Sequence, residues 1–118
     1  MFYGVNLTGA DLTNSQLAEA TLTTANLTTA DLSGANLRQV SAASANMTGA
    51  DLTETDLTDA NLSNGILSSA DLRETDLTRV NLNGVTATSA KLTFVSAQGS
   101  NLSNANLTSA TLIGGDFS

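Results

Sequence analysis

The sequence contains no cysteine, no histidine and no proline, and aromatic residues make up only 3% of its 118 positions. Without cysteine there is no disulfide, no thiolate metal site and no cysteine nucleophile. Without histidine the commonest general base and metal ligand is missing as well. We therefore expect a protein that is not an enzyme and that holds neither a metal nor a cofactor.

Positive charge is also scarce, because 4 Lys and Arg face 11 Asp and Glu, which leaves a net charge of -7. Proteins bind nucleic-acid phosphates mainly through Lys and Arg, so direct binding of nucleic acid is not expected. No apolar run approaches the ~20 residues of a membrane span, and no secretory signal opens the chain. We expect no membrane association and, by default, a cytoplasmic location.

A repeat of five residues occupies the chain. All 18 leucines belong to one series of positions that begins at residue 2 and continues in steps of five. The residue two positions before each leucine is most often alanine, the residue just before it is in most repeats Asn or Asp, and the residue after it is mostly Thr or Ser. The consensus is A-[DN]-L-[TS]-x. The other six members of the leucine series are Phe2, Ala42, Met47, Ala87, Ala97 and Phe117.

A period of five suits neither an α-helix nor a continuous strand. Successive leucines would wander around a helix, and on a strand they would alternate between its two faces. Every leucine points inward only if the chain turns a corner once per repeat. The pattern therefore predicts a β-solenoid, whose stacked coils share one core.

The distribution of charge predicts how many repeats make one coil. All 15 charged residues occur in two of every four successive repeats, and the other two repeats carry none. This is a period of 20 residues, so we expect a four-sided coil. About six coils would form one domain over residues 1–118, on the order of 28 Å long at ~4.8 Å per coil.

Segments such as Ala10-Asp11-Leu12-Thr13, Ala25-Asn26-Leu27-Thr28 and Ala50-Asp51-Leu52-Thr53 resemble the motif of the pentapeptide-repeat family. The resemblance covers nearly the whole chain. It implies an all-β fold, the right-handed quadrilateral β-helix. It also implies one function to consider, because some members of the family bind DNA gyrase by imitating DNA.

The candidate site is a pair of adjacent charged faces. The expected fold aligns four acidic residues on one face and two on its neighbour: Asp11, Asp31, Asp51 and Asp71, and then Asp56 and Asp76. One hypothesis is an acidic strip that imitates DNA phosphates and binds a DNA-binding enzyme such as gyrase. The alternative is a solvated surface that keeps a rod soluble. Carboxylates on a flat face diverge, so we expect no Ca²⁺ site.

The two uncharged faces carry ladders of hydroxyl and amide side chains. One ladder suggests a remote alternative, ice binding: Thr8, Thr28, Thr48, Ser68, Thr88 and Thr108. The competing interpretation is that Thr suits a strand and satisfies the turn backbone. Our principal hypothesis is a non-catalytic structural or protein-interaction solenoid.

The two ends of the solenoid form a separate feature. Phe2 and Phe117 are the only aromatic residues of the leucine series, and we interpret them as plugs of the core. Open ends expose unpaired backbone, so end-to-end self-association is expected. Three alanines replace leucine in the core, each two positions after a valine, and two of these (Ala87 and Ala97) fall in the fifth coil. We predict that this coil packs least tightly.

Overall fold

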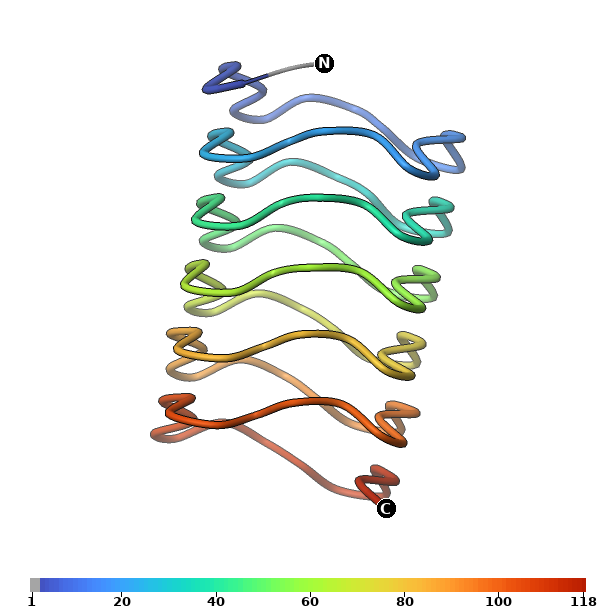
Figure 1. Cartoon of the computed structure of the whole chain (residues 1–118), viewed down its shortest axis with the longest axis vertical. Coiled ribbons are helices and arrows are strands. Elements are labelled where there is room, and N and C mark those ends of the chain that lie inside the picture. Colours follow the sequence, from blue (N-terminus) through green and yellow to red (C-terminus); the bar gives the residue numbers. More distant parts are fainter. Residues whose placement is uncertain (1–2) are drawn as a thin grey trace.

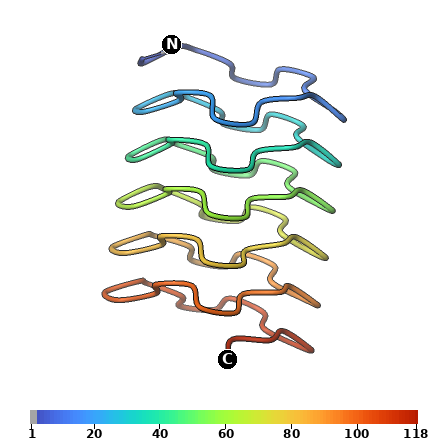
Figure 2. The same cartoon turned by 45° about the vertical axis from the view of Figure 1, so that its right-hand side comes forward.

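The computed structural model describes residues 3–118. The described chain winds about one axis into a rod of 32 × 22 × 20 Å, and its first coil lies at the opposite end of the rod from its last (Figure 1). Successive coils follow the same outline along the rod (Figure 2). Phe2, one of the two predicted plugs, lies outside the described residues.

The register of the coils is uniform. Nineteen parallel backbone bridges join the coils, and each one connects residues 20 positions apart, from Asn6 with Asn26 to Ser96 with Asp116. This register confirms the 20-residue period read from the charges, with four five-residue repeats in each coil.

The β-structure is more fragmented than the word solenoid suggests. Within residues 3–118 there is no helix and no continuous strand, because each bridge is isolated and involves only the residue before the inward position. The reason is a turn in every repeat. The residue two positions after each inward leucine, or after the residue that replaces it, adopts a left-handed backbone. Its φ lies between 54° and 69°, in seven glycines and in sixteen residues of other types. An extended run cannot continue through that conformation.

Backbone hydrogen bonds connect each repeat to the repeats above and below it. In one example the amide of Leu27 donates to the carbonyl of Asn46 at 2.7 Å, and the amide of Thr29 donates to Thr48 at 2.9 Å. The amide of Asn46 donates in the opposite direction, to Ala25, at 2.9 Å. The backbone groups of the interior coils are thereby paired although no long strand forms.

The core is a column of leucines and small residues. Leucines from Leu22 to Leu92 are buried, as are the alanines and valines that occupy the other inward position from Ala25 to Val95. Val40 and Ala42 are both fully buried, which fits the idea that a larger residue at one inward position compensates a smaller one at the other. The predicted inward direction of both positions is confirmed.

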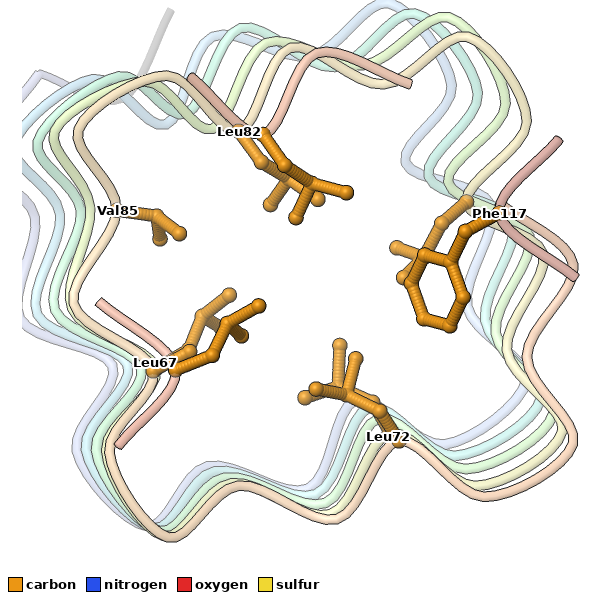
Figure 3. Close-up of a pocket in the computed structure, with 10 residues that line it drawn as sticks. Leu67, Leu72, Leu82, Val85 and Phe117 are labelled. Atoms are coloured by element: carbon orange, nitrogen blue, oxygen red, sulfur yellow. The ribbon is translucent and has the colours of Figure 1, made fainter. Parts of the chain in front are cut away.

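A narrow void runs along the axis toward the C-terminal end (Figure 3). Its volume is about 10 Å³, close to the lower limit for one water molecule. Val85 and Ala87 are among the residues that line it, together with leucines of the coils on either side, so the loosest packing in the fifth coil stays a prediction. Ala97 does not line the void. One coil further on, Phe117 occupies the inward position in register with Ala97, and its ring points toward the axis of the rod, into the void that Leu72 and Leu82 also line (Figure 3).

Candidate functional site: the charged faces

The candidate aspartates lie in two columns. Consecutive bridges connect Asp11, Asp31, Asp51 and Asp71 and then continue to Lys91. Neighbouring carboxylates in this column are one coil apart, about 4.8 Å along the rod. Asp56 and Asp76 are bridge partners on the adjacent face; the column there begins with uncharged residues and passes through Ser96 to Asp116. The structure thus brings together the six residues selected from the sequence.

Each aspartate of the candidate site accepts a hydrogen bond within the turn that follows it. Oδ1 of Asp31 accepts hydrogen bonds from the amide of Ser33 at 3.0 Å and from its hydroxyl at 2.7 Å. On an uncharged face, Oδ1 of Asn26 accepts the equivalent bonds from Thr28 at 3.1 and 2.6 Å. Such side-chain bonds to the backbone two residues on stabilise turns. The turn bond therefore uses the Oδ1 atom, which Asn and Asp both supply, and not the negative charge.

These hydrogen bonds also affect ionisation. The hydroxyl and amide of Ser33 lower the pKa of Asp31. Burial acts to raise the pKa of Asp71, but the hydrogen bonds from Arg73 and Lys91 outweigh it and the pKa is lowered. Hydrogen bonds keep the carboxylates in their charged form, so both aspartates carry a full negative charge at neutral pH.

Four basic side chains form ion pairs with some of the aspartates and leave the others unpaired. Arg38 pairs with Asp56 at 3.1 Å, and Arg79 pairs with Asp59 through two bonds of 2.6 and 2.8 Å. Asp71 is approached from two sides, by Arg73 at 2.8 Å and by Lys91 at 3.2 Å. Of the six candidates, four therefore have no ion pair within residues 3–118: Asp11, Asp31, Asp51 and Asp76.

Metal binding has little support in this geometry. Among the described residues, no three acidic side chains come close enough together to hold an ion. One oxygen of Asp31, and likewise one of Asp51, is already engaged by its turn. A hard cation such as Ca²⁺ requires six to eight converging oxygens.

The hydroxyl ladder of the uncharged face is largely bonded within the protein. The hydroxyls of Thr8, Thr28 and Thr48 each donate to the asparagine two positions earlier at 2.6 to 2.7 Å. The hydroxyl of Thr88 donates to that of Ser68 at 2.9 Å. These contacts favour a structural role for the threonines over the ice-binding alternative, because they support the Asn turn.

Sequence reasoning missed Phe94. Its side chain is 63% exposed, and that of Ile113, whose carbonyl accepts the Phe94 amide at 2.9 Å, is 68% exposed. Both lie beside the charged faces near the C-terminal end. The sequence does contain a signal, since a large aromatic at the last position of one repeat is followed 20 residues later by a glycine, Gly114.

The ends of the rod are apolar. A hollow of about 150 Å³ at the N-terminal end is lined by Val5, Leu7, Leu12, Leu17 and Leu22. At the other end Phe117 occupies an inward position and is 38% exposed. Its role as a plug and end-to-end association both stay predictions.

Across residues 3–118 no helix is long and apolar enough to traverse a membrane.

Comparison with known proteins gives one consistent family. The family model described as pentapeptide repeats matches in eight copies over residues 2–39, 23–59, 45–84, 55–93 and 88–118. The comparison with curated proteins gives no significant match.

Several solved structures share this architecture. A pentapeptide repeat protein, Rfr23 from the cyanobacterium Cyanothece 51142, is 29% identical with a TM-score of 0.75, over 97% of this chain and 86% of that one. A thylakoid-lumen pentapeptide repeat protein from Arabidopsis thaliana is 26% identical with a TM-score of 0.51, over 99% and 68%. HetL from Nostoc sp. strain PCC 7120, involved in heterocyst differentiation regulation, is 28% identical with a TM-score of 0.51, over 97% and 62%.

Proposed function

The chain belongs to the pentapeptide repeat family, and from this premise we propose that it is a non-catalytic interaction module. In this proposal a right-handed rod of about six coils presents its two charged faces to a protein partner. The interior supports the non-catalytic part, because leucines fill it: the void toward the C-terminal end measures only about 10 Å³, and the hollow at the N-terminal end is lined by apolar side chains alone. The site has no histidine or cysteine to act as base or nucleophile.

The observation that carries the proposal concerns the position just before the inward leucine, where Asp and Asn serve the turn equally well. Asn26 and Asp31 make the same pair of hydrogen bonds to their turns, so the fold accepts either residue. Charge is nevertheless confined to two of the four faces. Solubility alone is served equally well by charge spread over all sides of the rod. Confinement to adjacent faces is what a binding surface requires.

A DNA-mimicking inhibitor is the second candidate function, and the spacing of the unpaired aspartates favours it. Asp11, Asp31 and Asp51 follow one another at intervals of one coil, about 4.8 Å. Phosphates along one strand of duplex DNA are about 3.4 Å apart along the axis. The row of carboxylates therefore offers a basic DNA-binding surface a line of negative charges whose density along the rod approaches that of one DNA strand. The partner in this case is a DNA-binding enzyme such as gyrase.

A gyrase supercoiling assay tests this second candidate. The parent protein is compared with a variant in which five aspartates become asparagine: Asp31, Asp51, Asp56, Asp71 and Asp76. Asparagine preserves the turn bonds, so circular dichroism and the melting temperature should show an intact fold. Inhibition by the parent, weakened by salt and absent in the variant, supports the mimic.

The other outcomes separate the two candidates. No inhibition at micromolar protein removes gyrase as the target and leaves the interaction module with a different partner. Equal inhibition by parent and variant contradicts a role for the charged faces. A variant that fails to fold contradicts the argument that the carboxylate charge is structurally dispensable.

A further inference from the structure

One edge of the rod lies between the two charged faces and carries an unusual series of residues. The last position of each repeat on the Asp31 face forms this edge, and its residues follow one another at intervals of one coil: Asn14, Gly34, Glu54, Glu74, Phe94 and Gly114. Two exposed glutamates are thus followed directly by an exposed phenylalanine. Neither glutamate has an ion pair among the described residues.

The backbone at Phe94 is strained. Its φ is 59°, in the left-handed region that a bulky side chain adopts at a cost. The other fifteen non-glycine residues with positive φ are all polar. The left-handed conformation itself belongs to every repeat, so only the bulky apolar side chain at this position needs an explanation beyond the repeat.

Packing within the fold does not supply that explanation. The ring lies over Gly114, where a Cβ atom would stand 2.5 Å from Cδ1 of Phe94, so glycine is required beneath it. Even so, the ring is 63% exposed, and the neighbouring Ile113 is 68% exposed. The Phe94 ring thus occupies the space that a side chain at position 114 would need, although the ring itself stays largely exposed.

We propose that Phe94 and Ile113 are the apolar anchor of the interaction surface, beside the acidic edge of Glu54 and Glu74. This inference rests on the proposed function of the charged faces. The surface fits a protein segment that carries basic residues followed by one apolar residue. Arg73 and Lys91 share the single negative charge of Asp71, so with Glu54 and Glu74 this part of the edge keeps a net charge of -1.

A helix is the form of partner that matches this spacing. One helical turn advances about 5.4 Å, close to the ~4.8 Å between coils. A helix along the edge therefore places one Lys or Arg per turn opposite Glu54 and Glu74 and an apolar residue opposite Phe94. Few residues supply most of the energy of an interface, and aromatic side chains are frequent among them.

The test uses two synthetic helical peptides of about 20 residues with Lys at positions i and i+4. One carries Leu at i+8 and the other carries Ser. Fluorescence anisotropy should show that the parent protein binds the Leu peptide about tenfold more tightly, as expected for a hot-spot contact. Phe94→Asn should abolish this preference while the salt-dependent binding of both peptides remains.

Phe94→Asn is expected to fold, because the same edge already contains this arrangement. Asn14 lies over Gly34 with φ of 54°, just as Phe94 lies over Gly114. The substitution relieves strain, so the melting temperature should rise. A matched control is Asn64→Phe, which places a ring over Gly84 on an edge between the two uncharged faces. That variant should not bind the Leu peptide more tightly.

Three results would overturn the inference. The first is an unchanged Leu preference in Phe94→Asn. The second is a gain of Leu peptide binding in Asn64→Phe equal to the contribution of Phe94, which would indicate nonspecific adhesion. The third is a parent oligomer in sedimentation velocity that Phe94→Asn converts to monomer without affecting peptide binding, which would assign the ring to a second copy. If the parent binds neither peptide and still inhibits gyrase, this inference fails and the proposed function stands.

Discussion

The hydroxyl of Thr75 donates to the carbonyl of Leu52 across 2.7 Å and joins residues 23 positions apart. Thr55 makes the same contact with Leu32 at 3.0 Å, one coil earlier. Both threonines are 1% exposed at an inward position that alanine normally occupies. The core thus contains polar groups, and each of these two is satisfied by the backbone of the preceding coil.

Replacement of Thr75 by valine should destabilise the protein by about 1 kcal/mol, because one buried hydrogen bond is lost and the shape is retained. Valine is sterically acceptable here, since Val95 is buried one coil later in the same column. Chemical denaturation of parent and variant measures the difference. An unchanged or higher free energy of unfolding would show that the bond to Leu52 contributes nothing net.

Ser100→Ala should have the opposite effect. The Ser100 hydroxyl is buried and has no hydrogen-bond partner among residues 3–118, and an unsatisfied buried hydroxyl costs roughly 1–3 kcal/mol. Alanine already occupies the equivalent inward position at Ala60. We expect the free energy of unfolding to rise by about 1 kcal/mol. Ser15→Ala, at the other unpaired hydroxyl, is an independent repeat, and a loss of stability in both variants would contradict the argument.

The hydrogen bonds that Asp51 accepts within its own turn predict different effects on stability for two substitutions of this residue. Its Oδ1 accepts from the amide and the hydroxyl of Thr53 at 3.0 and 2.7 Å. Asp51→Asn keeps this acceptor and should change stability little, whereas Asp51→Ala removes it and should cost about 1 kcal/mol. Thermal melts at high salt, where charge effects are screened, make the comparison. Equal losses would mean that the charge stabilises the fold.

Acid should destabilise the protein. The folded-state pKa of Asp31 is lowered, with Ser33 as the main cause, and that of Asp59 is lowered chiefly by Arg79. A folded pKa below the unfolded value means that the unfolded state binds the proton more readily. Stability from these groups is therefore complete above the unfolded pKa, about 4, and is lost as the pH falls through the lower folded value.

Denaturant titrations at pH 7, 5 and 3 measure this dependence. We expect similar stability at pH 7 and 5 and a clear fall at pH 3. The fall should be smaller in Asp31→Asn, whose turn no longer includes a titrating group. A rise in stability toward pH 3 would show instead that repulsion within the column of Asp11, Asp31, Asp51 and Asp71 dominates.

Phe117 can be tested as a plug of the C-terminal end. Its ring approaches Gly115 closely enough that a Cβ there would lie 2.5 Å from Cε2. Phe117→Ala should cost about 1–2 kcal/mol, less than a fully buried phenylalanine, and Gly115→Ala should also destabilise by displacing the ring. Phe117→Leu restores the usual inward residue and is the control. Melting temperatures that do not differ would remove the plug interpretation.

The sequence alone was sufficient for the architecture. The spacing of the leucines predicted which residues point inward, and the charges predicted the 20-residue register that every bridge confirms. Both succeed because a solenoid repeats one local geometry, so the direction of a side chain depends only on its position within the repeat. The sequence did not predict that the bridges are isolated, because the left-handed turn residues are polar and mostly not glycine.

The composition of the candidate surface was decided by the tertiary structure. The ion pair of Arg38 with Asp56 joins residues 18 positions apart, and that of Arg79 with Asp59 joins residues 20 apart. A repeat pattern assigns a long side chain to a face but not to one of the several carboxylates within its reach. The exposed ring of Phe94 likewise depends on what lies one coil below it, since only the stacking of coils brings Phe94 over Gly114. Periodicity therefore determined the direction of each side chain, whereas packing between coils decided which charges and which apolar groups remain available to a partner.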